Sequence, residues 1–321
     1  MRGTPVVVSV DGAPPRAVIE WRKVKMEILP GIHRIESDLG VRFMCQYLLA
    51  GEDRTVLIDT GLAGTPEEVI IPYLGEIGLR LEDVDEVIIS HADLDHCGGN
   101  RALRERNPRL RFSCGEPDRP YVENSRVMLA EIYGWSEPYG FGPDEEAKAS
   151  ILEDLGGDSP IDAGLRGGET LRLGSDWRVE ILHLPGHTPG HLGIWDPKNG
   201  AAIIIDAVLE TGIYDREGNR LIPPRYFDAA QYQGTIRKLR ALRPEHLLTA
   251  HYPPMQGQEA LDFLDHSLDF TEQVHRVVSE GLQDGTTDLW ELTKRADTQL
   301  GPYPEFMTEL GAGVRAHMAV L

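Results

Sequence analysis

Cysteine is scarce in this sequence: Cys45, Cys97 and Cys114 are the only three among 321 residues. An odd, sparse set provides no disulfide framework and is typical of a reducing compartment. Long apolar runs are missing too, since the longest, residues 201–205, falls far short of the ~18 residues that span a bilayer. The three valines at residues 6–8 are too few for the core of a signal peptide. We therefore expect a soluble, cytoplasmic protein that does not enter a membrane.

Basic residues are also few. Lys and Arg number 32 against 52 Asp and Glu, which gives a formal net charge of −20. Such a charge repels phosphate backbones and anionic lipid, so we expect neither a nucleic acid nor a membrane surface as a partner. The basic stretch at residues 101–111 is interpreted as a solvated helix end. The expected partner is a small-molecule substrate.

The chain has 41% apolar residues and is long enough to bury a sizeable core. Short β-branched or Leu-rich stretches, bounded by Gly, Pro or Asp, predict strands at residues 46–49, 55–58, 86–89, 179–184, 201–205 and 247–249. Apolar residues that recur every three or four positions predict helices at residues 66–77 and 227–242. This mixture indicates a layered α/β or α+β domain.

The chain divides into a main domain and three less regular regions. Residues 1–27 are an N-terminal extension with a strand candidate at 6–10, and the main domain covers residues 28–257. Residues 121–165 form an insertion rich in aromatic and acidic residues, for which a lid or substrate wall and an ordinary surface excursion are both open. Residues 258–321 are predicted to be a C-terminal helical subdomain, which could wall a pocket or form a homodimer contact.

Histidine and aspartate gather directly after the predicted strands. A rigid sheet can aim side chains from its strand ends into one shared cleft. Imidazole and carboxylate together suit zinc, iron or manganese, and a pair of ions needs six or seven ligands with one bridging carboxylate. The set supplies seven candidate metal ligands: His91, Asp93, Asp95, His96, His187, Asp206 and His251. We therefore predict a site for two divalent metal ions.

The run His91-x-Asp93-x-Asp95-His96, with Asp59-Thr60-Gly61 before it and the three later ligands after it, resembles the metallo-β-lactamase superfamily. The resemblance covers about residues 28–254. It implies an α+β fold, a four-layered αβ/βα sandwich with the N-terminal extension and the C-terminal helical tail added. The first ion would then take His91, Asp93 and His187, the second ion Asp95, His96 and His251. Asp206 would bridge them, and Asp59 would steady the metal loop.

Asp93 departs from the family's usual His-x-His-x-Asp-His pattern, in which this position is a histidine. The extra carboxylate would make the first ion a weaker Lewis acid and favour harder metals such as iron or manganese over zinc, which otherwise ranks first. Family branches with a carboxylate here include di-iron proteins that handle oxygen. Another reading is that Asp93 reaches its metal poorly and that one ion alone is held tightly.

The segment from Leu184 to His191 and the run Ile205-Asp206-Ala207 are similar to the N-acyl homoserine lactonase branch. That branch places a catalytic Tyr three residues after the bridging Asp, where this chain has Leu209. Tyr214 is the nearest replacement, and three other tyrosines remain open: Tyr133, Tyr139 and Tyr226. His191 is interpreted either as a residue that orients the loop around His187 or as a packed side chain.

The resemblance implies a hydrolase in which a metal-bridging hydroxide attacks the carbonyl carbon of an ester, lactone or thioester. Asp95 would carry the proton to the leaving group. Aromatic residues at 133–141 suggest an apolar pocket wall and hence a substrate with an acyl or ring portion. Two alternatives stay open: a di-iron oxidoreductase of the same fold, and a metal-binding protein without catalytic activity.

Overall fold

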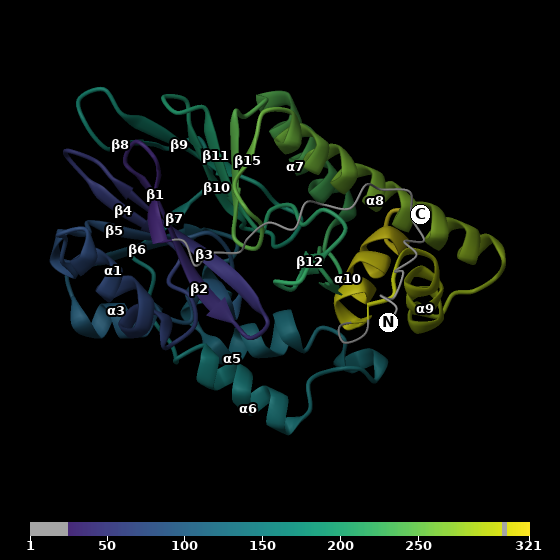
Figure 1. Ribbon diagram of the computed structural model, residues 1–321. Helices are drawn as coiled ribbons and strands as arrows, with labels where there is room; N and C mark the ends of the chain where they lie inside the picture. Colours follow the sequence, from purple (N-terminus) through teal and green to yellow (C-terminus); the bar gives the residue numbers. More distant parts are fainter. Residues whose placement is uncertain (1–24, 304–306) are drawn as a thin grey trace, which may run out of the picture.

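The structure, a computed structural model, describes residues 25–303 and 307–321, and its strands form two main sheets and a short ribbon (Figure 1). The first sheet has seven strands in chain order: β1 (Lys25–Leu29), β2 (Ile32–Leu39), β3 (Arg42–Ala50), β4 (Thr55–Ile58), β5 (Glu86–Ile89), β6 (Arg111–Gly115) and β7 (Ala163–Leu165). The second sheet has six, in the order β15 (Met255–Gln256), β14 (His246–Thr249), β11 (Ala201–Ile205), β10 (Leu192–Asp196), β9 (Arg178–His183) and β8 (Thr170–Arg172). The ribbon pairs β12 (Ile213–Tyr214) with β13 (Arg220–Ile222).

The two sheets stack because their central strands are apolar on both faces. Successive side chains of a strand point to opposite faces. In β4, Val56 and Ile58 pack into the core between the sheets, whereas Leu57 packs on the opposite side. In β11, Ile203 faces the same inter-sheet core and Ile204 packs into the outer core. Strands buried on both faces in this way require a layer of helices outside each sheet.

Helices supply those outer layers. Next to the first sheet lie a π-helical turn (Pro66–Ile70), α1 (Ile71–Glu76) and α3 (Asn100–Arg106), while α7 (Ala229–Leu242) and α8 (Gln258–Gln283) cover the second (Figure 1). Tyr73 and Leu74 of α1 are buried against the first sheet, and Tyr232 and Ile236 of α7 against the second. The predicted α+β class and four-layered αβ/βα sandwich are confirmed.

The predicted insertion is mostly short helices. It begins inside α4 (Arg119–Glu123) and contains α5 (Ser125–Met128), a π-helical turn (Leu129–Tyr133), a 3-10 turn (Glu137–Tyr139) and α6 (Glu145–Asp154). Its last residues form β7, which extends the first sheet. The region is therefore continuous with the sandwich and less irregular than its composition suggests.

The C-terminal region consists of α8, α9 (Leu289–Leu300) and α10 (Met307–Met318), which gather at one end of the molecule (Figure 1). Helix α8 continues through Gly281, which is buried. The predicted strand at residues 6–10 lies outside the described residues, and residues 25–27 belong to β1. Among the described helices, none is both long and apolar enough to cross a membrane.

Candidate metal centre

Strand register brings the candidate ligands to one edge of the two sheets. β4 pairs with β5 in parallel, as β11 does with β14, so the residues that follow each pair emerge side by side. His91 lies just beyond β5, Asp206 directly follows β11, and His251 lies just beyond β14. The carboxylate of Asp93 caps the short helix α2 (Leu94–Cys97), which carries Asp95 and His96. His187 lies on the connection between β9 and β10.

All seven candidate ligands converge. Their ligand atoms fall into three groups whose members lie within 4.8 Å of one another: His91, His96 and Asp206; His91, Asp93 and His187; Asp95, His96 and His251. The Nε2 atom of His251 is 3.1 Å from Asp206 Oδ2 and 3.5 Å from Asp95 Oδ2. His96 Nε2 is 3.5 Å from Asp206 Oδ2. Three overlapping groups of imidazoles and carboxylates, which share His91 and His96, match the donor set of a metal pair.

Each of the four histidines among the candidate ligands has Nδ1 in a hydrogen bond, so that Nε2 faces the centre. His96 donates from Nδ1 to the Asp59 carboxylate at 2.9 Å, and His187 and His251 donate from Nδ1 to backbone carbonyls, of Arg225 at 2.7 Å and Phe43 at 2.9 Å. Carboxylate and carbonyl oxygens only accept, so the hydrogen of each neutral ring lies on Nδ1. A neutral imidazole with Nδ1–H keeps its lone pair on Nε2, the form that binds metals.

His91 follows the same rule through Ser90. The Ser90 hydroxyl donates to Asp59 at 2.8 Å, so its oxygen accepts from His91 Nδ1 at 2.9 Å. Buried atoms that lack a hydrogen-bond partner in the described structure then include four at the centre: the Nε2 atoms of His91, His96 and His187, and Oδ1 of Asp206. Buried polar groups without partners are rare and costly in proteins. Cations bound by these groups would satisfy all four atoms, so the residues present fit divalent metal ions.

Asp59 connects the ligands to the first sheet. Its carboxylate accepts from the backbone N–H of Ser90 at 2.7 Å as well as from the Ser90 hydroxyl and His96. The backbone of Asp59 has φ of 65°, and Ile205, directly before Asp206, has φ of 52°. Left-handed backbone is unfavourable for a β-branched residue and costs roughly 1–3 kcal/mol. The fold therefore stores strain immediately before Asp206, one of the candidate ligands.

Charges at the centre act differently on the ligands: they favour the metal-binding forms of Asp206 and His187 but the protonated form of His96. Burial would raise the pKa of Asp206, but His251 and His96 outweigh burial and hold that pKa well below its usual range. Burial would lower the pKa of His96, but Asp95 and Asp206 hold it well above its usual value. Burial and then the Arg225 guanidinium lower the pKa of His187 to about 4. Asp206 is thus an anion and His187 a neutral donor near neutral pH.

His191 contributes through its ring. It is fully buried and stacks on His91 with ring centroids 4.6 Å apart and an angle of 18° between the planes. Neither of its ring nitrogens has a hydrogen-bond partner among the described residues. Stacking of this kind limits how the His91 ring can tilt.

A cavity of about 170 Å³ opens beside the ligands. Its lining includes Asp95, Arg42 from the start of β3, and Leu209, where the lactonase branch has its Tyr. Of the four tyrosines singled out from the sequence, Tyr133 lines the cavity, and its hydroxyl contacts the Asp93 carboxylate. Tyr214 is not among the lining residues, and its hydroxyl lies 2.8 Å from that of Thr211.

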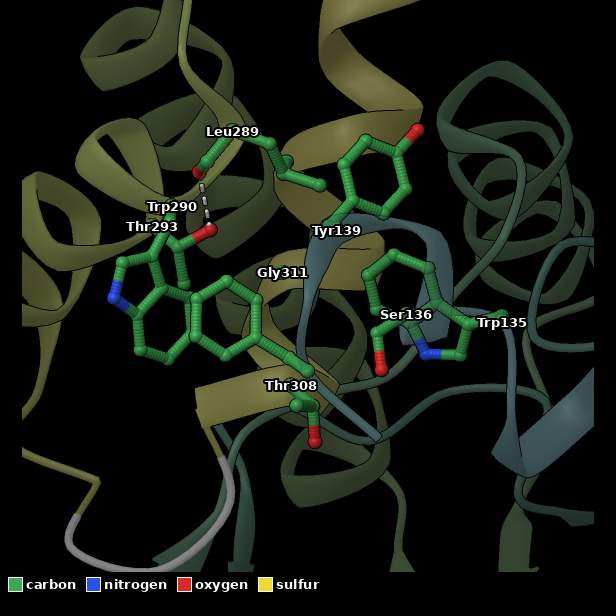
Figure 2. A pocket seen from close by; sticks show the side chains of 9 residues that line it. Trp135, Ser136, Tyr139, Leu289, Trp290, Thr293, Thr308 and Gly311 are labelled. Carbon is green, nitrogen blue, oxygen red and sulfur yellow. Dashed lines mark hydrogen bonds between the residues drawn. The ribbon is translucent and has the colours of Figure 1, made fainter. Parts of the chain in front are cut away.

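The rest of the aromatic stretch packs elsewhere. A separate space of about 10 Å³ against α9 and α10 is lined by Trp135, Tyr139 and Phe141. The ring of Phe141 stacks on that of Trp290, with ring centroids 3.9 Å apart. Figure 2 shows Trp135 and Tyr139 on one side of this space and Trp290 on the other. The expectation that residues 133–141 as a whole form the substrate wall is wrong for these three side chains. Trp135 is buried and Phe141 stacks on a residue of α9, whereas Tyr139 is 47% exposed.

The comparison with protein families decides the family. The model described as "Metallo-beta-lactamase superfamily" matches residues 45–251, which is well over half of the chain. The protein belongs to the metallo-beta-lactamase superfamily. The N-acyl homoserine lactonase of Bacillus sp is 25% identical over 255 residues, covering 70% of this chain and 84% of the relative.

Other relatives of this superfamily member are as distant. The hydroxyacylglutathione hydrolase GloC of Haemophilus influenzae is 27% identical over 169 residues, covering 53% of this chain and 68% of the relative. A solved metallo-beta-lactamase family protein from Thermus thermophilus superposes with a TM-score of 0.68 at 20% identity, over 92% of this chain and 94% of the other. That similarity concerns the fold alone.

Asp93, the departure from the superfamily pattern, is not a free carboxylate. It is bonded to the guanidinium of Arg225, which also pairs with Glu309 of α10, Nε to Oε2, at 3.2 Å. Sequence reasoning missed Arg225, Glu309 and also Asp118, a buried carboxylate behind the His91 and His187 loops. Arg225 is 132 positions from Asp93 and Asp118 is 70 from Thr188, so no local spacing could have indicated either pair.

Proposed function

We propose that this protein is a metal-dependent hydrolase that cleaves an ester, lactone or thioester carbonyl with two divalent ions, zinc ahead of iron and manganese. The observation that supports this most strongly is the convergence of buried, unpartnered Nε2 atoms from His91, His96 and His187 with Oδ1 of Asp206. The relatives named as an N-acyl homoserine lactonase and a hydroxyacylglutathione hydrolase favour carbonyl chemistry. Divalent ions held by this set would activate a water molecule and polarise the carbonyl oxygen of the substrate.

The chain's own groups account for the rest of the chemistry. Asp95 lines the cavity with a side chain that is 12% exposed, so it can take a proton from the attacking water and pass it to the leaving oxygen or sulfur. Leu209, Ile213 and Ile222 provide an apolar side of the cavity for the acyl or ring portion of a substrate. Arg42, at the same cavity, is placed to interact with a polar or anionic end.

Metal replacement combined with a substrate panel tests the proposal. The chain is stripped with a chelator, reloaded with zinc, iron or manganese, and assayed on esters, lactones, thioesters, phosphodiesters and β-lactams. We expect hydrolysis of at least one carbonyl class, lost on stripping and restored by metal. H96A and D206A should lose metal binding and turnover together, whereas H266A, which changes an exposed side chain on α8, should retain both. Retained turnover in H96A or D206A would refute the proposal.

The two alternatives give different results in the same experiment. An iron oxidoreductase would consume oxygen with a reductant and lose that activity when loaded with zinc. The main argument for iron was a free carboxylate at Asp93, and the pairing of this carboxylate with Arg225 weakens that argument. A metal-binding protein without catalysis would bind the ions and turn over none of the panel.

A further inference from the structure

Both oxygens of the Asp93 carboxylate already have partners. Oδ2 accepts from Nη2 of Arg225, and Oδ1 accepts from the Tyr133 hydroxyl and from the backbone N–H of Leu94 at 3.0 Å. The same Oδ2 lies 3.9 Å from His91 Nε2 and 4.0 Å from His187 Nε2, where an ion of the first group would sit. Arg225 therefore binds the very oxygen that Asp93 would offer to a metal.

Arg225 is fixed in this position from three directions. Its side chain is only 6% exposed, and Glu309 of α10 pairs with its Nε at 3.2 Å. Its backbone carbonyl accepts from Nδ1 of His187 at 2.7 Å. One residue thus contacts two of the three side chains in the His91–Asp93–His187 group, and a helix of the C-terminal region holds that residue in place. A buried guanidinium between two carboxylates is not easily displaced, because leaving would strand both charges.

The second group has no such competitor. Among the described residues, no Lys or Arg forms an ion pair with Asp95 or Asp206, and the partners found for these two carboxylates are His96 and His251. An ion there would meet two carboxylates that no Lys or Arg of the described residues pairs with, and two imidazoles. An ion in the first group would meet two imidazoles, the shared Asp206 and a carboxylate already neutralised by a fixed cation nearby.

We infer that Arg225 withholds Asp93 from the first metal position, so that the two positions bind ions unequally: the Asp95–His96–His251 position fills first and the His91–His187 position is the weak one. Arg225 acts as a positioning residue, and Glu309 connects the C-terminal helices to the affinity of the weak position. This inference rests on the proposed pair of metal sites but not on hydrolysis, and metal binding alone tests it.

Zinc titration of the stripped full-length chain by calorimetry, with metal analysis after dialysis, is the experiment. We expect the wild type to bind one ion tightly and a second at least tenfold more weakly. R225Q frees Asp93 and should tighten the second ion about tenfold or more. In the charge-balanced double variant D93N/R225Q, the second ion should bind within about threefold of wild type, because the lost carboxylate was not a ligand. R220Q, which removes an arginine of β13 bonded to the Leu300 carbonyl, should bind like wild type.

D93H provides a second test that keeps Arg225. An imidazole cannot pair with the guanidinium and is free to bind the metal, so we expect the second ion to tighten; unfolding curves of each variant establish that it is folded. If the wild type binds two ions with equal affinity, the inference is overturned and the proposed metal pair stays intact. The same holds if the second ion binds to R225Q or to D93H with no higher affinity than to the wild type. Loss of the second ion in D93N/R225Q would identify Asp93 as a ligand and overturn it too. No ion bound by the wild type would overturn the metal centre itself.

Discussion

The carboxylate of Asp118 accepts a hydrogen bond from the hydroxyl of Thr188, the residue directly after His187. It also accepts from the backbone N–H of Gly190 at 2.6 Å and from that of Ala92 at 3.1 Å. Ala92 follows His91 beyond a strand of the first sheet, and Gly190 precedes a strand of the second. One completely buried carboxylate therefore connects the loops that carry His91 and His187 across the two sheets.

The substitution D118N should loosen this connection. An amide nitrogen in place of one oxygen cannot accept, so at least one buried donor loses its partner. We expect a loss of about 2–3 kcal/mol in the free energy of unfolding, measured in urea, and roughly tenfold weaker zinc binding. D158N is the matched control, because Asp158 accepts from the backbone and hydroxyl of Ser125 on the surface. Equal effects of D118N and D158N would contradict the assigned role.

Tyr133 is the tyrosine we expect to matter for turnover. Its hydroxyl is at the cavity, bonded to Asp93 and 2.9 Å from the backbone nitrogen of Leu94. With a substrate that the panel identifies, Y133F should lower kcat about tenfold, since the hydroxyl holds the Asp93 carboxylate at the cavity and loss of one such hydrogen bond is worth about 1.4 kcal/mol. Y214F, the variant of the tyrosine nearest in sequence to Leu209, should leave kcat within about twofold of wild type. The reverse order of effects would assign the role to Tyr214.

The stack of Phe141 on Trp290 should hold the insertion against the C-terminal helices. F141A removes the ring and opens the small space shown in Figure 2. We expect a loss of about 1–3 kcal/mol in stability and faster proteolytic cleavage between Trp135 and the start of α6. V41A, which trims an exposed side chain in the β2–β3 turn, is the control. Unchanged cleavage in F141A would mean that other contacts hold the insertion.

The residues at the strand ends could be predicted from the sequence, whereas the partners that lie far apart in the sequence could not. Asp59, His91 and Asp206 each lie just beyond a short apolar strand, so local patterning together with the family resemblance was enough to place them at one edge. Arg225 and Glu309 belong to no such pattern, and they meet only because α10, which packs against α7, α8 and α9, brings Glu309 back to a residue 84 positions earlier in the sequence. Composition had the same limit at Trp135: an aromatic stretch indicates burial but not which surface buries it. Helix α10 lies within the predicted C-terminal helical subdomain, but its bounds were not singled out, since small residues such as Gly311 and Gly313 give little helical periodicity.

The docking of α10 should be sensitive to acid through His317. This side chain is buried, with Nε2 3.0 Å from the hydroxyl of Tyr226 and Nδ1 3.3 Å from Nδ1 of His275 on α8; the cavity beside it is also lined by Glu272. Burial, and then His275, lower the pKa of His317 from 6.5 to about 4. The unfolded chain therefore binds a proton in the window from about pH 6.5 down to 4 that the folded chain excludes.

Stability should accordingly be fully present above pH 6.5 and fall as the pH drops toward 4, by up to about 3 kcal/mol from this residue alone at about 1.4 kcal/mol per pH unit. H317Q keeps an amide that can bond Tyr226 but cannot titrate, so its stability should fall less over the same window. Urea unfolding of the metal-free chain at pH 7, 6, 5 and 4.5 measures the difference. The control is H266Q, which replaces an exposed histidine of α8 and should follow the wild type. If H317Q and the wild type lose the same free energy of unfolding between pH 6.5 and 4.5, His317 is not the group responsible. Its replacement by Gln removes the proton that the unfolded chain would bind at this position, so the loss should have become smaller.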